Sequence, residues 1–323
     1  TIEVVNGTFS TVLEGLVANG TGSLEITLHA PDGSLVTTCN PATVSEAPKL
    51  MSYWGDLHGQ SDETLGTNSA ADYFTFGRDK AFLDVMGHQG NDFQITGRVW
   101  KHLNELTAQF DVPGAFVCIP GYEWSANTAV GGDRNVHYRH EGETIHRSSH
   151  AQIADPTDMV DEESDAHTAN ELFDKLRDKD CVVAAHVGGR YADITFAHDH
   201  ALETAVEVHS AWGTFEWIVW DAFDKGFRVG IVGNSDGHKG RPGACFPGAS
   251  FFGSQGGLTC FLAPRLDRDA VFEAMRRRHH YATTGNRLFL DVAVTTPNDA
   301  TLFLKNPPGE APQTTQVRRL IMG

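Results

Sequence analysis

Six short apolar runs in this 323-residue chain each end, within a few residues, in a histidine or a carboxylate. The side chains that follow the runs are Asp56 with His58, then His88, Glu123, His186, His209, and Asp236 with His238. Runs of four to six aliphatic residues without polar alternation are typical of strands buried on both faces. Parallel strands of this kind end at one common rim, so groups just beyond their ends meet in space. The pattern predicts a site that holds more than one metal ion.

The expected ligands combine imidazoles with carboxylates, a mixture that suits Zn, Mn or Fe better than Mg or Ca. We expect two to three divalent ions, held by His58, Glu63, His88, Glu123, His186, His209, Asp236 and His238. Asp62 is the alternative to Glu63. Ions about 3.5–4 Å apart can hold a bridging hydroxide, which would serve as the nucleophile. Glu123, Asp236 and His238 are the expected catalytic residues, with Glu123 able to bridge two ions.

Each histidine taken alone has a simpler interpretation, as a hydrogen-bonded structural or surface residue. The chain has 16 histidines, and seven are assigned to this class: His29, His102, His140, His146, His150, His279 and His280. The pairs that share a strand end, His58 with Asp56 and His238 with Asp236, are the best candidates for ligands. No Walker loop or G-x-G-x-x-G turn occurs, so a nucleotide-phosphate loop is not expected.

Polar and cationic side chains near the expected ligands indicate an anionic small-molecule substrate. The candidate contacts are Gln60, Arg134, His137, Arg190, Lys239 and Arg241. Cations beside a ligand cluster are best explained by an anion that joins them. The alternative is that each cation pairs with a local Asp or Glu. Trp124, Tyr191 and Trp212 adjoin expected ligands and are interpreted either as pocket walls or as rim packing.

The charge balance limits the classes of partner. Lys and Arg number 25 and Asp and Glu 42, so the formal net charge is −17. Such a surface repels nucleic acid and anionic membranes, and we expect neither as a partner. The five cysteines form no C-x-x-C pair, which argues against a disulfide framework or a zinc finger.

Targeting signals are weak. No apolar stretch approaches the roughly 20 residues of a bilayer span. No signal peptide is visible, although the chain begins at Thr1. The compartment is therefore open, with the cytoplasm favoured, and the oligomeric state is open too.

The pattern of polar and apolar residues along the chain indicates three parts. Residues 1–49 and 286–323 alternate polar and apolar residues around turns, and we expect the two ends to pair into a small β layer. Residues 50–285 alternate buried strands with helical segments, which favours a parallel β/α barrel of the α/β class. Helices are expected from Thr168, over 214–225, and from Asp267. Residues 125–166 lack periodicity and are interpreted as a lid or a surface loop.

The ligand segments resemble the PHP (polymerase and histidinol phosphatase) superfamily of metal-dependent phosphoesterases, and within it the DUF3604 group. The resemblance covers residues 53–285 and rests on six motifs: Gly55–His58, Leu83–His88, Gly121–Trp124, Ala185-His186, Val208-His209 and Ser235–His238. Tyr281–Gly285 is also similar to that group. The resemblance to the PHP superfamily implies a distorted (β/α)7 barrel that carries up to three metals.

The resemblance also implies how the ions are shared. His58, Glu123 and Asp236 would hold the first metal, and Glu123 would bridge to a second one bound by His186 and His209. His88 and His238, with an acidic residue from the Asp62–Glu63 loop, would hold a third. The chain departs from the family at Gln60, where the H-x-H motif has its second histidine, so Gln60 is either a weak metal ligand or a substrate contact.

Three functions remain open at this point. The first is a metal-dependent phosphoesterase, for phosphomonoesters or phosphodiesters of small molecules. The second is a hydrolase of a carboxylic ester or amide that uses the same metal cluster. The third is a non-catalytic, metal-stabilised module of a larger assembly.

Overall fold

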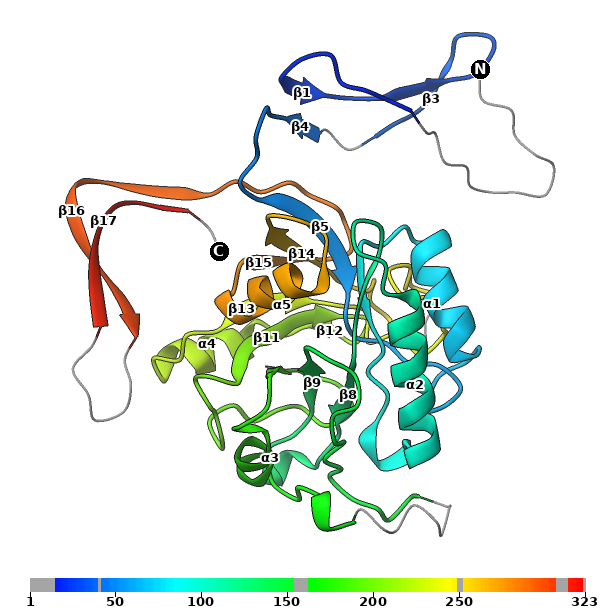
Figure 1. Ribbon diagram of the computed structural model, residues 1–323, viewed down its shortest axis with the longest axis vertical. Helices are drawn as coiled ribbons and strands as arrows, with labels where there is room; N and C mark the ends of the chain where they lie inside the picture. Colours follow the sequence, from blue (N-terminus) through cyan, green and yellow to red (C-terminus); the bar gives the residue numbers. More distant parts are fainter. Residues whose placement is uncertain (1–14, 40–41, 154–161, 249–251, 306–312, 322–323) are drawn as a thin grey trace.

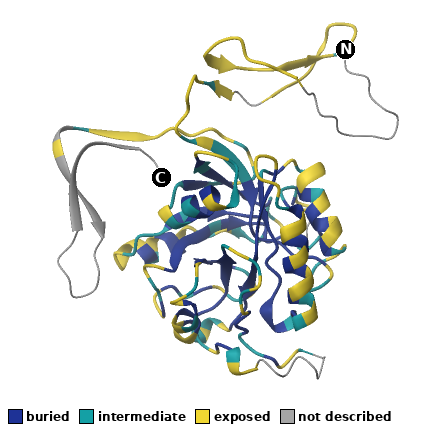
Figure 2. Cartoon of the chain, viewed as in Figure 1, coloured by how far each residue is buried: buried dark blue, intermediate teal, exposed yellow. Residues whose placement is uncertain are grey.

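The computed structural model describes residues 15–39, 42–153, 162–248, 252–305 and 313–321. Two β sheets and the helices around them form the body, and a β arm extends from it at each end of the chain (Figure 1). The interior of the body is buried, whereas the described parts of both arms are largely exposed (Figure 2). The site lies in the body, at the ends of its strands.

The first sheet has the order β15-β14-β5-β6-β7. Its strands are β5 (Met51–Asp56), β6 (Val85–Gly87), β7 (Val117–Ile119), β14 (Leu258–Ala263) and β15 (His280–Thr283). Strands β5, β6 and β7 are parallel, and β14 is antiparallel to both of its neighbours. Aliphatic side chains fill β6 and β7, and all their residues are buried, as expected for strands covered on both faces.

The second sheet has the order β12-β11-β10-β9-β8, with β13 also paired to β11. Its strands are β8 (Gly121–Trp124), β9 (Arg134–Tyr138), β10 (Cys181–Ala185), β11 (Glu203–Ser210), β12 (Gly213–Thr214) and β13 (Gly230–Gly233). Strands β10, β11 and β13 are parallel, whereas β8, β9 and β10 run antiparallel to one another in turn. The mixed α/β class is therefore confirmed.

The expected (β/α)7 barrel is not found in the described part of the chain, where the strands of the body pair into two separate sheets. The regular alternation fails at Pro120, the single residue between β7 and β8, and again between β8 and β9, which no α-helix separates. Bridges beyond the strand ends still connect the sheets, because Gly59 pairs with Gly237 and Asn91 pairs with Glu123. These bridges bring the strand ends of both sheets to one place.

Five α-helices cover the sheets: α1 (Ala70–Asp79), α2 (Gly97–Phe110), α3 (Ala169–Leu176), α4 (Glu216–Asp224) and α5 (Arg268–Arg277). Short 3-10 turns include η1 (Asp92–Gln94) and η2 (Thr128–Val130). Four of the helices begin at a side chain that accepts a backbone N–H, namely Ser69, Thr96, Thr168 and Asp267. The three helices expected from the sequence are thus confirmed. None of the described helices is long and apolar enough to cross a bilayer.

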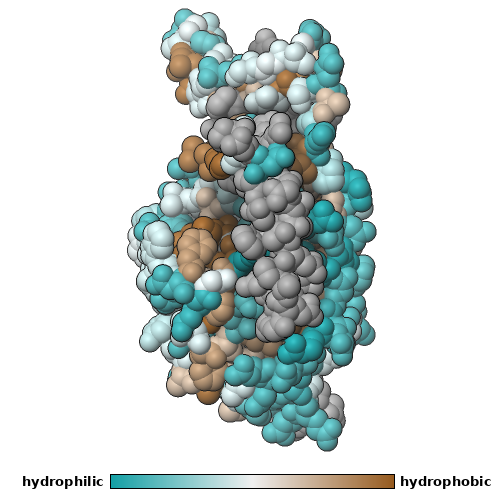
Figure 3. All heavy atoms as spheres, turned by 90° about the vertical axis from the view of Figure 1, so that its left-hand side faces the viewer, coloured by the Kyte–Doolittle hydropathy of each residue, from teal (hydrophilic) through white to brown (hydrophobic). Residues whose placement is uncertain are grey.

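The two arms do not pair with each other in the described residues, contrary to the β layer expected from the sequence. In the N-terminal arm, β1 (Gly22–Leu24) pairs with β4 (Ala42–Val44) and β2 (Thr27–His29) pairs with β3 (Leu35–Thr38). In the C-terminal arm, β16 (Ala293–Lys305) pairs with β17 (Gln313–Ile321). The described strands of each arm therefore pair within the same arm. Figure 3 shows patches of apolar side chains among the hydrophilic ones on the side of the molecule turned to the viewer.

The stretch 125–166 is neither a free lid nor a floppy loop where the structure describes it. All five residues of β9 are buried within the second sheet. His146, Arg147 and His150 are also buried, and Arg147 Nε donates to the carbonyl of Ile95 over 3.0 Å. Residues 154–161 lie outside the described part. None of the five cysteines, all of them in the described residues, forms a disulfide.

Candidate metal centre

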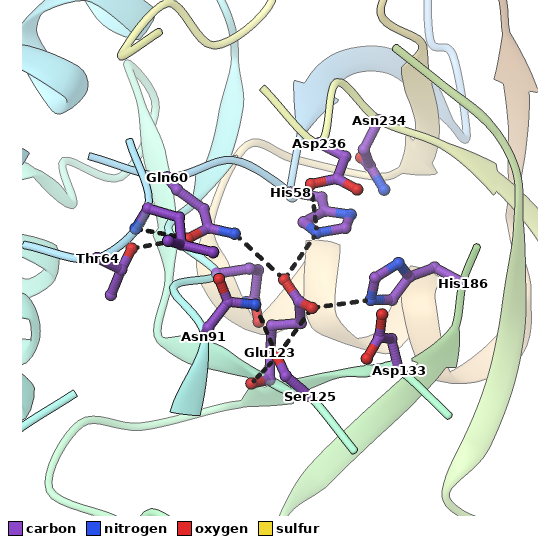
Figure 4. A network of polar contacts seen from close by, with 12 residues as sticks. His58, Gln60, Thr64, Asn91, Glu123, Ser125, Asp133, His186, Asn234 and Asp236 are labelled. Atoms are coloured by element: carbon purple, nitrogen blue, oxygen red, sulfur yellow. Dashed lines mark hydrogen bonds and ion pairs between the residues drawn. The ribbon is translucent and has the colours of Figure 1, made fainter. Parts of the chain in front are cut away.

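Four expected ligands meet at the strand ends of the two sheets (Figure 4). His58 follows β5, Glu123 lies in β8, His186 follows β10 and Asp236 follows β13. His58 Nε2 is 3.6 Å from Glu123 Oε2 and 3.3 Å from Asp236 Oδ1. His186 Nε2 is 3.7 Å from Glu123 Oε1. All four side chains are buried, so residues spread over nearly two hundred positions form one cluster.

Backbone contacts hold this cluster in place. The N–H of Asp236 and the hydroxyl of Ser235 both donate to the carbonyl of His58, over 2.8 and 2.9 Å. Asp236 adopts a left-handed backbone with φ of 44°, a conformation that costs a non-glycine residue free energy and often marks functional sites. Asp56 points away from the cluster and accepts backbone N–H groups of Ser235 and Gly243. Asp56 therefore fixes the loop that presents Asp236.

Glu207 is a buried carboxylate that the sequence analysis missed. His58 Nδ1 donates to Glu207 Oε1 over 3.0 Å, and the Asn234 amide donates to Glu207 Oε2 over 2.7 Å. This contact fixes a proton on Nδ1 and leaves Nε2 toward Glu123 and Asp236. A carboxylate behind a histidine is the usual way to orient a metal ligand.

Asp133 is a second residue that the sequence analysis missed. One oxygen each of Asp133 and Glu123 and one nitrogen of His186 lie within 4.8 Å of one another. Burial, and after it the charge of Glu123, raises the pKa of Asp133 well above its usual value. Arg190 counters this, because its Nε donates to Asp133 Oδ1 over 2.9 Å. No apolar run precedes Asp133 as one precedes the other acids, so the sequence carries no comparable signal for it.

Gln60 contacts Glu123 through its amide nitrogen, over 3.3 Å. Its carbonyl oxygen accepts from the Thr64 hydroxyl over 2.8 Å and from the Leu65 N–H over 3.3 Å. The amide oxygen is thus engaged away from the cluster, and Gln60 hydrogen-bonds the central carboxylate instead of offering a lone pair to an ion.

The three residues expected to bind a third ion do not assemble among the described residues. Glu63 and His88 meet through Ser61, whose hydroxyl donates to Glu63 and lies 2.7 Å from His88 Nε2. His238 is not with them, because its Nε2 contacts Asp236 Oδ1, at the edge of the donor cluster, over 3.2 Å. Burial lowers the pKa of His88 to about 4, which keeps its ring neutral. Among the described residues three overlapping groups of donors lie close enough to share an ion, and none of them contains Glu63, His88 or His238. The third group joins His58, His186 and Glu207.

His209 does not reach the cluster, although the sequence analysis included it among the ligands. Its Nδ1 contacts Thr214 Oγ1 at 2.7 Å, and its Nε2 contacts the carbonyl oxygen of Gln255 at 2.9 Å. The pairing of β11 with β13 shifts register between Glu207 and His209. A bulge of this kind redirects side chains, so Glu207 faces the cluster and His209 does not.

Two of the expected substrate contacts are structural. Arg134 and Glu203 are completely buried and form an ion pair of 2.8 Å between Nε and Oε1. Arg134 also donates to four backbone carbonyls. His137 accepts from Gln89 over 3.0 Å, and burial lowers its pKa to about 3. Neither side chain is available to a substrate.

A cleft with a volume of about 240 Å³ opens over the cluster. It is lined by Leu65, Asn91, Glu123, Gly188, Gly189, Arg190, Trp212, Asp236, His238 and Phe252. Arg190 is the cation in this lining, with Nη2 3.8 Å from Glu123 Oε1 and its guanidinium 5.2 Å from the Phe93 ring centre. Lys239 and Arg241 follow His238 but do not line the cleft.

The electrostatics of the cluster suit divalent cations. Burial disfavours the charges of Glu123 and Asp236, yet contacts with His58 and the charges of nearby histidines hold both pKa values below their usual range. Burial acts to lower the pKa of His58, but Asp236 and Glu207 raise it well above its ordinary value. A proton on His58 thus balances the carboxylates until a metal replaces it.

Unpartnered atoms and open space also fit a metal. His58 Nε2 and both ring nitrogens of His186 are buried without hydrogen-bond partners, which is rare for polar atoms in folded proteins. A Cβ added at Gly188 would lie 3.3 Å from Asp236 Oδ2 and from His186 Cε1, and 3.5 Å from Asp133 Oδ2. Glycine at position 188 therefore keeps the space between the donors open.

The model of the family "Protein of unknown function (DUF3604)" matches residues 25–189 and 248–296, more than half of the chain. The chain belongs to the DUF3604 family. The resemblance drawn from the sequence is thereby confirmed at the level of this family.

Relatives of this DUF3604 protein include an uncharacterized protein of Chlamydia pneumoniae, 24% identical over 289 residues, which are 81% of this chain and 44% of that protein. An uncharacterized protein of Chlamydia trachomatis is 22% identical over 308 residues, 88% of this chain and 48% of that protein. The chain thus spans about half the length of the curated relatives it matches.

A solved structure from Bacteroides vulgatus has a similar fold, with a TM-score of 0.50 and 13% identity over 87% of this chain and 85% of that one. It is described as a two-domain protein containing a predicted PHP-like metal-dependent phosphoesterase. At this identity the likeness concerns the fold of the DUF3604 chain alone.

Proposed function

We propose that this protein is a metal-dependent phosphoesterase that hydrolyses a small-molecule phosphomonoester or phosphodiester. The observation that carries the proposal is the pair of buried, unpartnered nitrogens, His58 Nε2 and His186 Nε2, which face the two oxygens of Glu123 over 3.6 and 3.7 Å. A carboxylate between two such nitrogens is suited to bridge two ions. The PHP-like description of the B. vulgatus protein agrees with this reaction class.

Two donor groups would hold the ions. His58, Glu123 and Asp236 form the first, and Glu123, Asp133 and His186 form the second. The imidazole–carboxylate mixture suits Zn, Mn or Fe. When bound, such ions polarise a phosphoryl oxygen and acidify a coordinated water.

In this proposal the chain's own residues bind the substrate, orient the metal ligands and limit the access of water. Arg190 presents its guanidinium at the cleft, where it would pair with a phosphoryl oxygen. Glu207 keeps the proton on His58 Nδ1, and Gln60 orients Glu123 by donating to Oε2. Leu65, Trp212 and Phe252 line the cleft with apolar surface that limits the access of bulk water.

A serine nucleophile is a poor alternative. Ser235 stands in a Gly-x-Ser-x-Gly stretch, Gly233–Gly237, the letter pattern of a nucleophile elbow. Its hydroxyl is buried, however, and donates to the carbonyl of His58 over 2.9 Å. Ser235 therefore stabilises the loop beside the cluster through this hydrogen bond.

The proposal is tested with protein that has been stripped by a chelator and reloaded with Zn²⁺, Mn²⁺ or Fe²⁺. We expect hydrolysis of p-nitrophenyl phosphate or bis-p-nitrophenyl phosphate, lost on stripping and restored on reloading. His186→Ala and Asp236→Ala should each lower the bound metal, measured by mass spectrometry, and reduce kcat/KM at least about 100-fold. His140→Ala, an exposed histidine outside the cleft, is the matched control and should change neither.

Two results would overturn the proposal. Turnover of p-nitrophenyl acetate without turnover of either phosphate ester would favour a carboxylic ester hydrolase. A protein that binds metal yet hydrolyses none of the three substrates would favour a non-catalytic, metal-stabilised module.

A further inference from the structure

An aromatic wall stands on one side of the cleft. The rings of Trp212 and Phe252 are stacked, with centroids 3.7 Å apart and planes inclined by 24°. Both residues line the cleft that contains Glu123 and Asp236. Trp212 lies two residues beyond the end of β11, and its backbone N–H donates to Ser210 Oγ over 3.2 Å, which ties the backbone at Trp212 to the end of that strand.

His238 lies between this aromatic wall and the candidate metal centre and contacts both. The Phe252 ring meets the His238 ring edge to face, with centroids 5.3 Å apart. His238 Nε2 in turn lies 3.2 Å from Asp236 Oδ1. A substituent attached to a phosphorus atom at the donor cluster would therefore reach Phe252 and Trp212 without a long linker.

Glycines keep the wall accessible on the cleft side. A Cβ added at Gly189 would find only Trp212 Cη2 within 4 Å, at 3.9 Å. Gly188 likewise leaves the space over the donors open. The lining thus combines a polar end at the donor cluster, one guanidinium from Arg190, and an aromatic end at Trp212 and Phe252.

We infer that the substrate is a phosphoester that carries a flat aromatic group, which packs on the Trp212–Phe252 wall while Arg190 holds the phosphoryl oxygens. The inference rests on the proposed function and narrows its substrate class. Aromatic rings stack favourably on one another in offset or edge-to-face arrangements, beyond the gain from buried apolar area. An alkyl substituent of the same ester would fill less of the wall and lack the stacking contact.

The test compares two non-hydrolysable probes, phenylphosphonate and methylphosphonate. They differ only in the group attached to phosphorus, which is a phenyl ring in one and a methyl group in the other. Their binding to metal-loaded protein is measured by titration calorimetry, so the readout does not depend on turnover. We expect phenylphosphonate to bind at least about tenfold more tightly. Trp212→Ala should remove this preference while leaving the affinity for methylphosphonate within about twofold.

Trp217→Ala is the matched control. Trp217 is exposed on α4 and does not line the cleft, so this variant should keep the preference for the phenyl probe. Phe252→Leu, which preserves apolar bulk, should keep part of it. Equal binding of both probes by the unmodified protein, or equal weakening of both by Trp212→Ala, would overturn the aromatic subsite alone. Failure of both probes to bind the metal-loaded protein would overturn the proposed function as well.

Discussion

A single buried carboxylate decides which nitrogen of His58 faces the cluster. Glu207 accepts the Nδ1 proton and is itself held by Asn234, so the lone pair of Nε2 is directed at the space between Glu123 and Asp236. Outer contacts of this kind are worth about 10- to 100-fold in metal affinity. We therefore expect Glu207→Gln to weaken metal binding by about that factor, measured by competition with a chromophoric chelator.

His209→Gln is the matched control on the same strand. Both nitrogens of His209 are engaged by Thr214 and Gln255, so its replacement should leave the metal affinity within about twofold. A loss of metal in His209→Gln as large as that in Glu207→Gln would make His209 a ligand, as the family resemblance implies.

The contrast between Glu207 and His209 shows which parts of the site can be predicted from the sequence and which cannot. Residues at strand ends, His58, Glu123, His186 and Asp236, were found because the strand itself positions them. The choice between Glu207 and His209 depends on a register shift in β11, which leaves no mark in the apolar pattern. Asp133 was missed for a related reason, since it becomes a neighbour of the cluster only through antiparallel pairing of β9 with β10.

At the level of elements, the Arg134–Glu203 ion pair ties β9 to the start of β11 through the interior. Both side chains are completely buried, and removal of one partner from such a pair leaves an uncompensated charge that costs about 3–5 kcal/mol. Arg134→Met should accordingly lower the free energy of unfolding by that amount, measured by urea denaturation. The double variant Arg134→Met/Glu203→Leu should recover only the part of the loss that comes from the uncompensated carboxylate, because it also removes the partner of His198 Nδ1, 2.6 Å from Glu203 Oε2.

Arg190→Met separates this structural role from a role in substrate binding. Arg190 is about one-third exposed and lines the cleft, so its replacement should raise KM for a phosphate ester. The loss of stability should be smaller than in Arg134→Met, because Arg190 is partly open to solvent and its replacement removes from the interior the side-chain contact with Asp133. If Arg134→Met left the stability unchanged and raised KM, the sequence-based assignment of Arg134 to the substrate would stand.

Elements whose signals are local were predictable, and elements that depend on partners were not. The helices that begin at Thr168 and Asp267 carry their own capping residues, and both form as expected. The pairing of strands is a long-range property, and the apolar pattern of β8, β9 and β14 does not state whether a neighbour runs parallel or antiparallel. The same limit applies to the arms, whose described strands pair within each arm.

For the whole molecule, several buried neutral histidines make the stability of the metal-free protein depend on pH. Burial lowers the pKa of His280, in β15, to about 4, against about 6.5 for an unfolded histidine. Between these values the unfolded chain binds a proton that the folded chain excludes, so stability falls as the pH drops from 6.5 to 4. One such proton corresponds to about 1.4 kcal/mol per pH unit.

His280→Gln isolates this contribution far from the donor cluster. Gln retains a donor for the carbonyl of Ile231, to which His280 Nδ1 is 3.2 Å away, but it cannot take up a proton. The free energy of unfolding of metal-free protein is measured by urea denaturation from pH 7.5 down to pH 4.5. It should fall less steeply in His280→Gln than in the unmodified chain, and the difference in slope should correspond to the uptake of about one proton. His140→Gln, at an exposed site, should retain the original slope. Identical slopes in all three proteins would mean that His280 takes up its proton in the folded state as readily as in the unfolded one.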